Sequence, residues 1–266
     1  MSLSYFYGLV LIPVLSTCGF LVSAYAGPLN DTGIDFLHSQ GAGIVAGSDA
    51  NFVRVPVPGA QDARYGRDAA ALQHALQKQG GSAGTRAGRP NGFDFTKVSN
   101  VGAMLPEETA LGSEPNGWAC TYDNNTGLMW EVKIADATHL RSMGHTYSWY
   151  RGDGREGELA DGGACHAAGR CDTIKYVQDV NEVGLCGYHD WRLPTPLELA
   201  NIVDRGRKSP AIDPIYFPNT PATLYWASSA VAGLRGVGWL RNFQNGGGAF
   251  ELMDEPHSIR LVRKSK

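Results

Sequence analysis

The chain has 266 residues, of which 34 are glycine and 14 are proline, and its formal net charge is -3 at pH 7. This length accommodates one large domain, or one domain with an N-terminal extension. The abundance of glycine and proline predicts many turns, which argues against a helical bundle and favours an α+β or β architecture. A nearly neutral chain has no global positive field, so nucleic acid is not an expected partner.

Residues 1–26 contain no Lys, Arg, Asp or Glu and are mostly apolar. They end in Ser-Ala-Tyr-Ala, which is typical of the small-residue site where a signal peptide is cleaved. We therefore predict a signal peptide at 1–26 and a bacterial protein that is periplasmic, secreted or at the cell surface. A retained membrane anchor is the alternative, but Gly8, Pro13 and Gly19 interrupt an apolar run that is barely long enough to span a bilayer.

Cysteine usage predicts two disulfides. Of the five cysteines, removal of Cys18 with the signal peptide leaves Cys120, Cys165, Cys171 and Cys186. An even count in an exported protein indicates disulfides, and three pairings exist. Cys165 and Cys171 enclose a short loop that closes easily, so we predict Cys165–Cys171 and Cys120–Cys186. Zinc is the rival interpretation, but this spacing is not the usual one for zinc ligands, and we expect no metal and no cofactor.

Residues 27–112 are expected to form a loop-rich N-terminal extension. This segment contains one short predicted helix, at 69–77, and a linker rich in glycine at 80–90. Alternation of apolar and polar residues predicts a strand at 93–98. The denser domain follows, at 113–266.

The 113–266 domain begins with a predicted hairpin, in which strands at 118–122 and 128–133 flank an Asp-Asn-Asn-Thr-Gly turn. Three later strands are predicted at 224–229, 238–243 and 258–263.

Two helices are predicted between these groups of strands. Asp172 is expected to cap the first, which ends at Gly184. Thr195 and Glu198 form a capping box at the start of the second, which is expected to stop at Gly206. The side chains expected to face the core from this second helix are Leu197, Leu199, Ile202 and Val203. Short strands after two helices indicate an α+β fold, with the two helices packed on a small antiparallel sheet with long loops.

Four separate blocks of this domain resemble the bacterial Lcl C-terminal domain, also called DUF1566, which is named after the Legionella collagen-like adhesin. The blocks are 123–133, 186–195 with its Asp-Trp-Arg-Leu-Pro-Thr run, 225–229 and 259–263. The resemblance covers residues 115–264 and implies an exported domain with a C-type-lectin-like fold. In the namesake adhesin the domain binds sulfated host polysaccharides as a trimer, so the resemblance implies a polysaccharide or a surface protein as partner, and a homo-oligomer.

This chain differs from that adhesin in two features. The chain has no Gly-X-Y repeat that would trimerise it, and its net charge is -3, whereas a sulfated polymer requires a basic patch. Sugar binding is therefore a hint at the level of the family, because a fold does not determine a function.

The six tryptophans are candidates for stacking on sugar rings. Trp130 and Trp191 lie in apolar or capped segments, so we expect them in the core. The late aromatic residues lie among Ser, Asn, Arg and Gly, which favours a position at the surface. The predicted ligand-binding face consists of Tyr225, Trp226, Trp239, Arg241 and Asn242.

Other possible sites have weaker patterns. Glu114-Pro115-Asn116 matches the Ca²⁺ and sugar tripeptide of C-type lectins, but it lies ahead of the first predicted strand of the domain rather than in the late long loop. Asp123 and Asp213 are acidic but do not have the ligand spacing of an EF-hand. The chain has no Gly-x-Ser-x-Gly motif, no P-loop and no Gly-x-Gly-x-x-Gly motif, so we expect no catalytic residues and no enzyme.

These patterns predict an exported recognition domain of the adhesin type that binds a glycan or another surface partner without catalysis. The alternative is a structural subunit of an envelope or extracellular fibre complex, with the late aromatic strands buried in an interface. A third hypothesis, an oxidase-like enzyme, requires a reactive thiol at Cys165 or Cys171. Arg192 is expected to pair with a carboxylate, since its guanidinium suits two parallel hydrogen bonds.

Overall fold

The computed structural model describes residues 93–154 and 157–264. The predicted signal peptide, the predicted helix at 69–77 and the predicted linker lie outside the described residues. None of the helices in the described ranges is long and apolar enough to cross a membrane.

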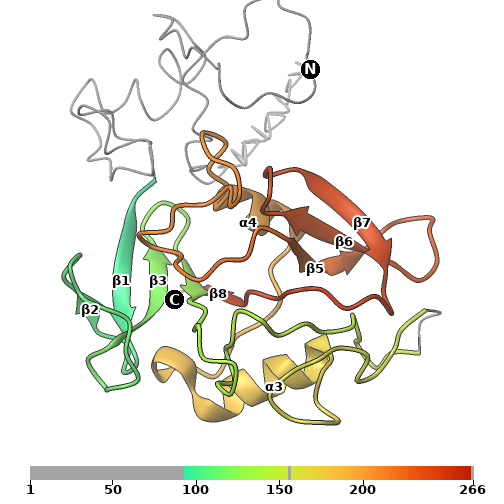
Figure 1. Cartoon of the computed structure of the whole chain (residues 1–266), viewed down its shortest axis with the longest axis horizontal. Coiled ribbons are helices and arrows are strands. Elements are labelled where there is room, and N and C mark those ends of the chain that lie inside the picture. Colours follow the sequence, from blue (N-terminus) through green and yellow to red (C-terminus); the bar gives the residue numbers. More distant parts are fainter. Residues whose placement is uncertain (1–92, 155–156, 265–266) are drawn as a thin grey trace, which may run out of the picture.

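The first sheet has five strands in the order β2-β1-β3-β4-β8 (Figure 1). Its hairpin of β3 and β4 confirms the predicted pair of strands, and β1 confirms the strand expected near 93–98. Since β1 and β2 pair in the same sheet as β3, part of the segment assigned to the extension is integrated in the domain. The strands are β1 (Phe95–Ser99), β2 (Met104–Leu105), β3 (Trp118–Asp123), β4 (Leu128–Glu131) and β8 (Val262–Lys264).

The second sheet has three antiparallel strands in the order β5-β6-β7, namely β5 (Leu224–Ala230), β6 (Val237–Asn242) and β7 (Gly248–Leu252). Two of them confirm the predictions at 224–229 and 238–243, whereas β7 was not predicted. The strand expected at 258–263 begins only at Val262. Residues 258–261 instead run between the two sheets, where the backbone N–H of Trp226 donates to Ser258 and that of Glu131 donates to Leu261.

The helices begin where the sequence predicts. Helix α3 (Thr173–Val183) has Asp172 as its N-cap and Gly184, with a φ of 67°, as its C-cap. Helix α4 (Pro196–Asn201) has the complete capping box of Thr195 and Glu198. A 3₁₀ turn, η1 (Leu185–Gly187), follows α3.

Helix α4 is shorter than predicted. It ends before Ile202, because the N–H of Asp204 donates to Ala211 at 3.1 Å instead of continuing the helix, and the Asp204 carboxylate accepts from Gly206. Leu199 is buried, as expected, and so are Ile202 and Val203. The expectation for Leu197 was wrong: its side chain is 67% exposed, since it lies on the outer side of the first turn.

Both predicted disulfides are present, Cys120–Cys186 and Cys165–Cys171. Cys120 and Cys186 lie in the larger apolar core, which also contains Trp149, Trp191 and Trp226. A second apolar core lies beside α4 and includes Trp130 and Tyr225. The two helices and two small antiparallel sheets confirm the α+β class, while a C-type-lectin-like arrangement stays a prediction.

Candidate functional site

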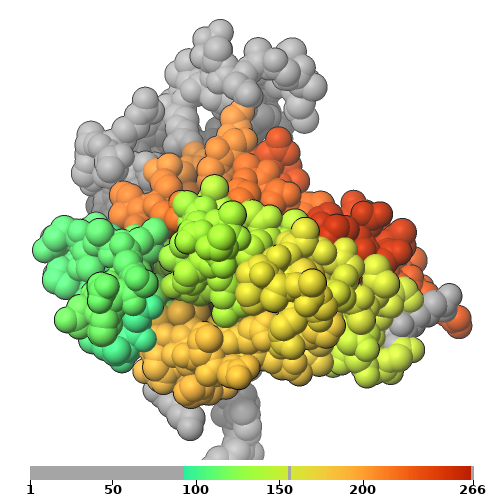
Figure 2. Space-filling model, turned by 60° about the horizontal axis from the view of Figure 1, so that its bottom comes forward, coloured from blue at the N-terminus to red at the C-terminus, as the bar shows by residue number. Residues whose placement is uncertain are grey.

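A groove of about 550 Å³ lies between the start of α3 and the segment that leads into α4. Its aliphatic lining comes from Ile174, Val177 and Leu193. Its polar lining consists of hydroxyl groups and guanidinium groups, contributed by Tyr150, Thr173, Thr195, Ser228, Arg151 and Arg192. In Figure 2 the α3 side of the molecule comes forward, with α3 in yellow beside the yellow-green loop that precedes it.

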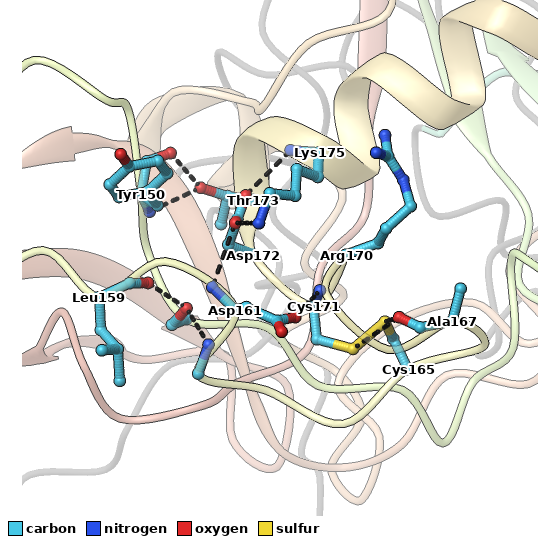
Figure 3. Close-up of polar contacts among 12 residues, drawn as sticks. Tyr150, Leu159, Asp161, Cys165, Ala167, Arg170, Cys171, Asp172, Thr173 and Lys175 are labelled. Atoms are coloured by element: carbon cyan, nitrogen blue, oxygen red, sulfur yellow. Dashed lines mark hydrogen bonds and ion pairs between the residues drawn. A yellow bond between two sulfur atoms is a disulfide. The ribbon is translucent and has the colours of Figure 1, made fainter.

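Reciprocal hydrogen bonds fix Tyr150 against the start of α3 (Figure 3). The Thr173 hydroxyl donates to the Tyr150 carbonyl at 2.7 Å and accepts from the Tyr150 N–H at 2.9 Å. The Asp172 carboxylate is fully buried, accepts from the Lys175 N–H at 3.0 Å and pairs with the Lys175 ammonium at 2.9 Å. This side of the groove is therefore held rigidly by the helix cap.

The loop before α3 is attached to the same cap. The second oxygen of the Asp172 carboxylate accepts from the Asp161 N–H at 3.2 Å, and the Asp161 carboxylate accepts from the Cys171 N–H at 2.6 Å (Figure 3). The Cys165–Cys171 disulfide closes this loop with a Cα–Cα distance of 5.4 Å. Since Cys171 directly precedes Asp172, the disulfide braces the groove.

The opposite side of the groove is fixed by Arg192, whose pairing with a carboxylate confirms the prediction. Its guanidinium donates to both oxygens of Glu198, at 2.8 and 2.6 Å. Burial alone would raise the pKa of Glu198, but the hydrogen bonds from Arg192 and Thr195 outweigh it, so this pKa is lowered. The Arg192 side chain is 43% exposed and keeps one edge open to a ligand.

Arg151 is the less constrained cation of the groove. Its side chain is 50% exposed, and its Nε lies 3.9 Å from an oxygen of Asp153. Its guanidinium carbon also lies 5.9 Å from the centre of the Trp149 ring. The groove thus offers one guanidinium held by a carboxylate and a second that can move toward a ligand.

The predicted ligand face is wrong for two of its five residues. Tyr225 and Trp226 are fully buried. The Trp226 indole N–H donates to the Tyr147 carbonyl at 2.8 Å, and the Tyr225 ring packs edge-on against Phe243. The polar neighbours in the sequence suggested a surface strand, but β5 lies between the two apolar cores, so both of its faces are covered.

The other three residues of that face are half-buried and lie on β6, apart from the groove lining. The Arg241 guanidinium donates to the carbonyls of Pro196 and Gly246, at 3.0 and 3.3 Å, and so ties the sheet to α4. The side-chain oxygen (Oδ1) of Asn242 accepts from the Gln244 N–H and shapes the turn after β6. Trp239 packs edge-on against Phe250 and keeps part of its ring accessible.

The remaining tryptophans are buried, which confirms the core interpretation for Trp130 and Trp191. The indole of Trp191 donates to the Leu185 carbonyl at 3.0 Å, and that of Trp149 donates to Ala227 at 2.9 Å. Most of the tryptophans therefore stabilise the fold and are not available to stack on a sugar.

A buried ionic cluster was not predicted from the sequence. The Glu131 carboxylate pairs with the Lys133 ammonium at 2.8 Å and accepts hydrogen bonds from the Tyr176 hydroxyl and, at 2.9 Å, from the Leu261 N–H. Arg260 donates to the Glu131 carbonyl at 2.6 Å. Burial lowers the pKa of Lys133 to about 8, against the opposing effect of Glu131. Because these side chains are at most 3% exposed, the cluster cross-links the fold and is closed to a substrate.

The acidic residues considered for calcium have other roles. The Asp123 carboxylate accepts from the Asn125 N–H and the Thr126 hydroxyl, which shapes the turn between β3 and β4. Asp213 is buried, and burial raises its pKa to about 6. Within residues 93–154 and 157–264, no group of three His, Cys, Asp or Glu side chains could hold a metal ion.

A second hollow, of about 630 Å³, lies at the loop between β5 and β6 and is lined by residues 230–236 and Met253. It is the larger of the two, but among its lining side chains only Arg235 is charged and none carries a hydroxyl or amide group that could orient a ligand. The groove beside α3 combines apolar surface with convergent polar groups, as ligand sites usually do. We therefore assign the candidate site to the groove.

Comparison with known proteins agrees with the resemblance seen in the sequence. The family model of the Lcl C-terminal domain matches residues 119–263, which is more than half of the chain. No curated protein and no solved structure matches it. The matched range contains both disulfides, the Glu131 cluster and the whole groove.

Proposed function

Because the chain belongs to the Lcl C-terminal domain family, we propose that it is an exported recognition domain of the adhesin type that binds a surface glycan without catalysis. The two disulfides support export, since disulfides persist in oxidising compartments and are rare in the cytosol. The membership itself supports the adhesin-like role.

The observation that carries the proposal is the composition of the groove. Hydroxyl groups both donate and accept hydrogen bonds, and guanidinium groups donate in a fixed plane, which together suits the hydroxyl and carboxylate groups of a saccharide. The aliphatic side chains of Ile174, Val177 and Leu193 offer apolar surface for the C–H faces of sugar rings. The helix cap and the Cys165–Cys171 disulfide keep these groups in place without a ligand, which lowers the entropy lost on binding.

The absence of catalysis is supported by the same lining. Among the described residues that line the groove there is no His, Asp, Glu or Cys that could serve as a general base for its hydroxyl groups. The cysteines of the third hypothesis, Cys165 and Cys171, are joined to each other. The acid and amine of the Glu131 cluster lie in the core.

A glycan-array screen of residues 27–266 tests the proposal, with variants that separate the groove from the face predicted on β6. Arg151→Ala and Ser228→Tyr change the groove, and Trp239→Ala is the matched control outside it. We expect saturable binding that both groove variants weaken and that the control retains. Loss in the Trp239 variant alone would move the site to β6, and no binding to any glycan class would contradict the function.

A structural subunit of an envelope or fibre complex is the second candidate. It is favoured by the apolar side chains that β7 exposes, Phe250 and Leu252. Sedimentation velocity of the same chain distinguishes the two: a discrete species fits recognition, whereas open-ended assembly that Phe250→Ser disperses fits the structural role.

A further inference from the structure

Strand β7 is an outer strand of the three-stranded sheet (Figure 1). The N–H of Asn242 donates to Gly247 at 2.9 Å, and the N–H of Met253 donates to Gly236 at 2.8 Å. Backbone groups point alternately to the two sides of an antiparallel strand. Ala249 and Glu251 therefore face β6, and the backbone groups of Phe250 and Leu252 point away from it.

Within the described residues, the outward-pointing backbone groups of Phe250 and Leu252 form only one intramolecular hydrogen bond. The Leu252 carbonyl accepts from the Glu255 N–H at 3.1 Å. The N–H and C=O of Phe250 and the N–H of Leu252 remain directed outward. Such a row of backbone groups is a template for pairing with another strand.

The side chains of the edge are apolar on one face of the sheet. Phe250 is 56% exposed and Leu252 is 53% exposed. In the register of the sheet they lie opposite Trp239 and Val237, and the Phe250 ring centre is 6.3 Å from that of Trp239. Phe250 and Leu252 thus form, with the half-buried Trp239 behind them, an apolar strip along an open edge.

The same edge is acidic. Glu251, Asp254 and Glu255 are all exposed, and none of the three forms an ion pair with another described residue. Glu251 and Glu255 both lie close enough to His257 to act on it electrostatically. A ligand that covers the edge would have to place positive charge beside these carboxylates.

We propose that the outer edge of β7 docks an extended segment of a partner protein in which aliphatic and basic side chains alternate. Its backbone pairs with the outward groups of Phe250 and Leu252, which is strand addition to a sheet edge. Its aliphatic side chains then lie beside Phe250 and Leu252 on the apolar face. Its basic side chains, on alternate positions, meet Glu251 on the other face, where opposite charges in cross-strand pairs are favourable.

The acidic residues select this partner over two other occupants. A second β7 strand from another copy, paired antiparallel about Phe250, would bring two sets of Glu251 and Glu255 to one edge, where like charges repel. A bilayer with anionic lipids would be repelled for the same reason. An extended basic segment pairs with the outward backbone groups, covers the apolar strip and places positive charge beside the carboxylates.

The test uses residues 27–266 and two fluorescent, end-blocked peptides, one alternating valine with lysine and the other alternating valine with glutamate. We expect the lysine peptide to bind roughly tenfold more tightly in fluorescence anisotropy at low salt, because each cross-strand charge pair changes from repulsive to attractive. We also expect bound lysine peptide to slow amide hydrogen exchange of Phe250 and Leu252.

Two charge reversals provide the matched control. Glu251→Lys should remove or invert the preference between the peptides, whereas Glu182→Lys, an exposed acid on α3, should leave it unchanged. Phe250→Ser, which changes a side chain that is 56% exposed, should weaken binding of the lysine peptide. Absence of binding by both peptides, equal effects of the two reversals, or a dimer that Phe250→Ser disperses would each overturn the proposal.

Discussion

Replacing Asp213 by asparagine should remove a pH dependence of stability that this carboxyl group imposes. Its side chain is 1% exposed, Oδ1 accepts from the Ile215 N–H at 2.9 Å, and Oδ2 has no hydrogen-bond partner. Burial is the main cause that raises the pKa of Asp213 to about 6, with Asp204 adding to it and Arg207 opposing it.

The sign and size of the effect follow from linkage. A carboxyl group in the unfolded chain titrates near pH 4, so between about pH 4 and pH 6 the folded protein binds more protons than the unfolded one. The free energy of unfolding therefore falls as the pH rises through this window. The difference of roughly two pH units corresponds to about 3 kcal/mol, or a melting temperature lower by about 6–12 °C for a domain of this size.

Urea unfolding of the wild type and of Asp213→Asn, between pH 4 and pH 7.5, measures this effect. Other groups titrate in both proteins, so the difference between the two curves isolates Asp213. We expect the wild type to lose about 3 kcal/mol relative to the variant as the pH rises. Asparagine carries its own unsatisfied N–H group, which shifts the whole curve without changing its slope. Parallel curves would refute the reasoning.

Three further experiments test the parts of the fold that position the groove. Glu131→Gln should lower the free energy of unfolding by about 3–5 kcal/mol, because Lys133 loses its buried counter-charge, whereas Glu198→Gln, at the half-exposed pair, should have a clearly smaller effect in the same urea titration. Replacing both Cys120 and Cys186 by alanine should cost about 4 kcal/mol by the chain-entropy model for a long closed loop, and a value near zero by chemical denaturation would show that this disulfide does not restrict the unfolded chain. Thr195→Ala should cost about 1 kcal/mol through loss of the α4 N-cap, with Thr138→Ala in an exposed loop as the control in a thermal melt.

The predictable parts of the fold were those with local signals. The ends of α3 and the start of α4 depend on residues within three or four positions of each other, as for Asp172 with Lys175. Cys165 and Cys171 could be paired from their short spacing, and the other disulfide followed by elimination. Strand β7 was missed because Gly248–Leu252 is short and begins within a run of three glycines at 246–248, so its pattern resembles a loop.

The candidate site was less predictable, because burial depends on distant segments. Tyr225 and Trp226 have polar neighbours in the sequence, but residues 258–261 cover one edge of β5 and α4 packs near it. Glu131 and Lys133 follow the alternation of a strand with one solvated face, yet Tyr176 and Leu261, far away in the sequence, enclose them. The groove joins Tyr150, Arg192 and Ser228, which share no local motif.

The course of residues 258–264 between the two sheets has a consequence for the order in which the protein can fold. This segment supplies β8 at the edge of one sheet, a backbone partner for Trp226 in the other, and the Leu261 N–H and Arg260 guanidinium that surround Glu131. All the disulfide cysteines precede it in the sequence. In an oxidising compartment, both covalent links can therefore form while the interior is still open, and the domain closes only when this segment arrives.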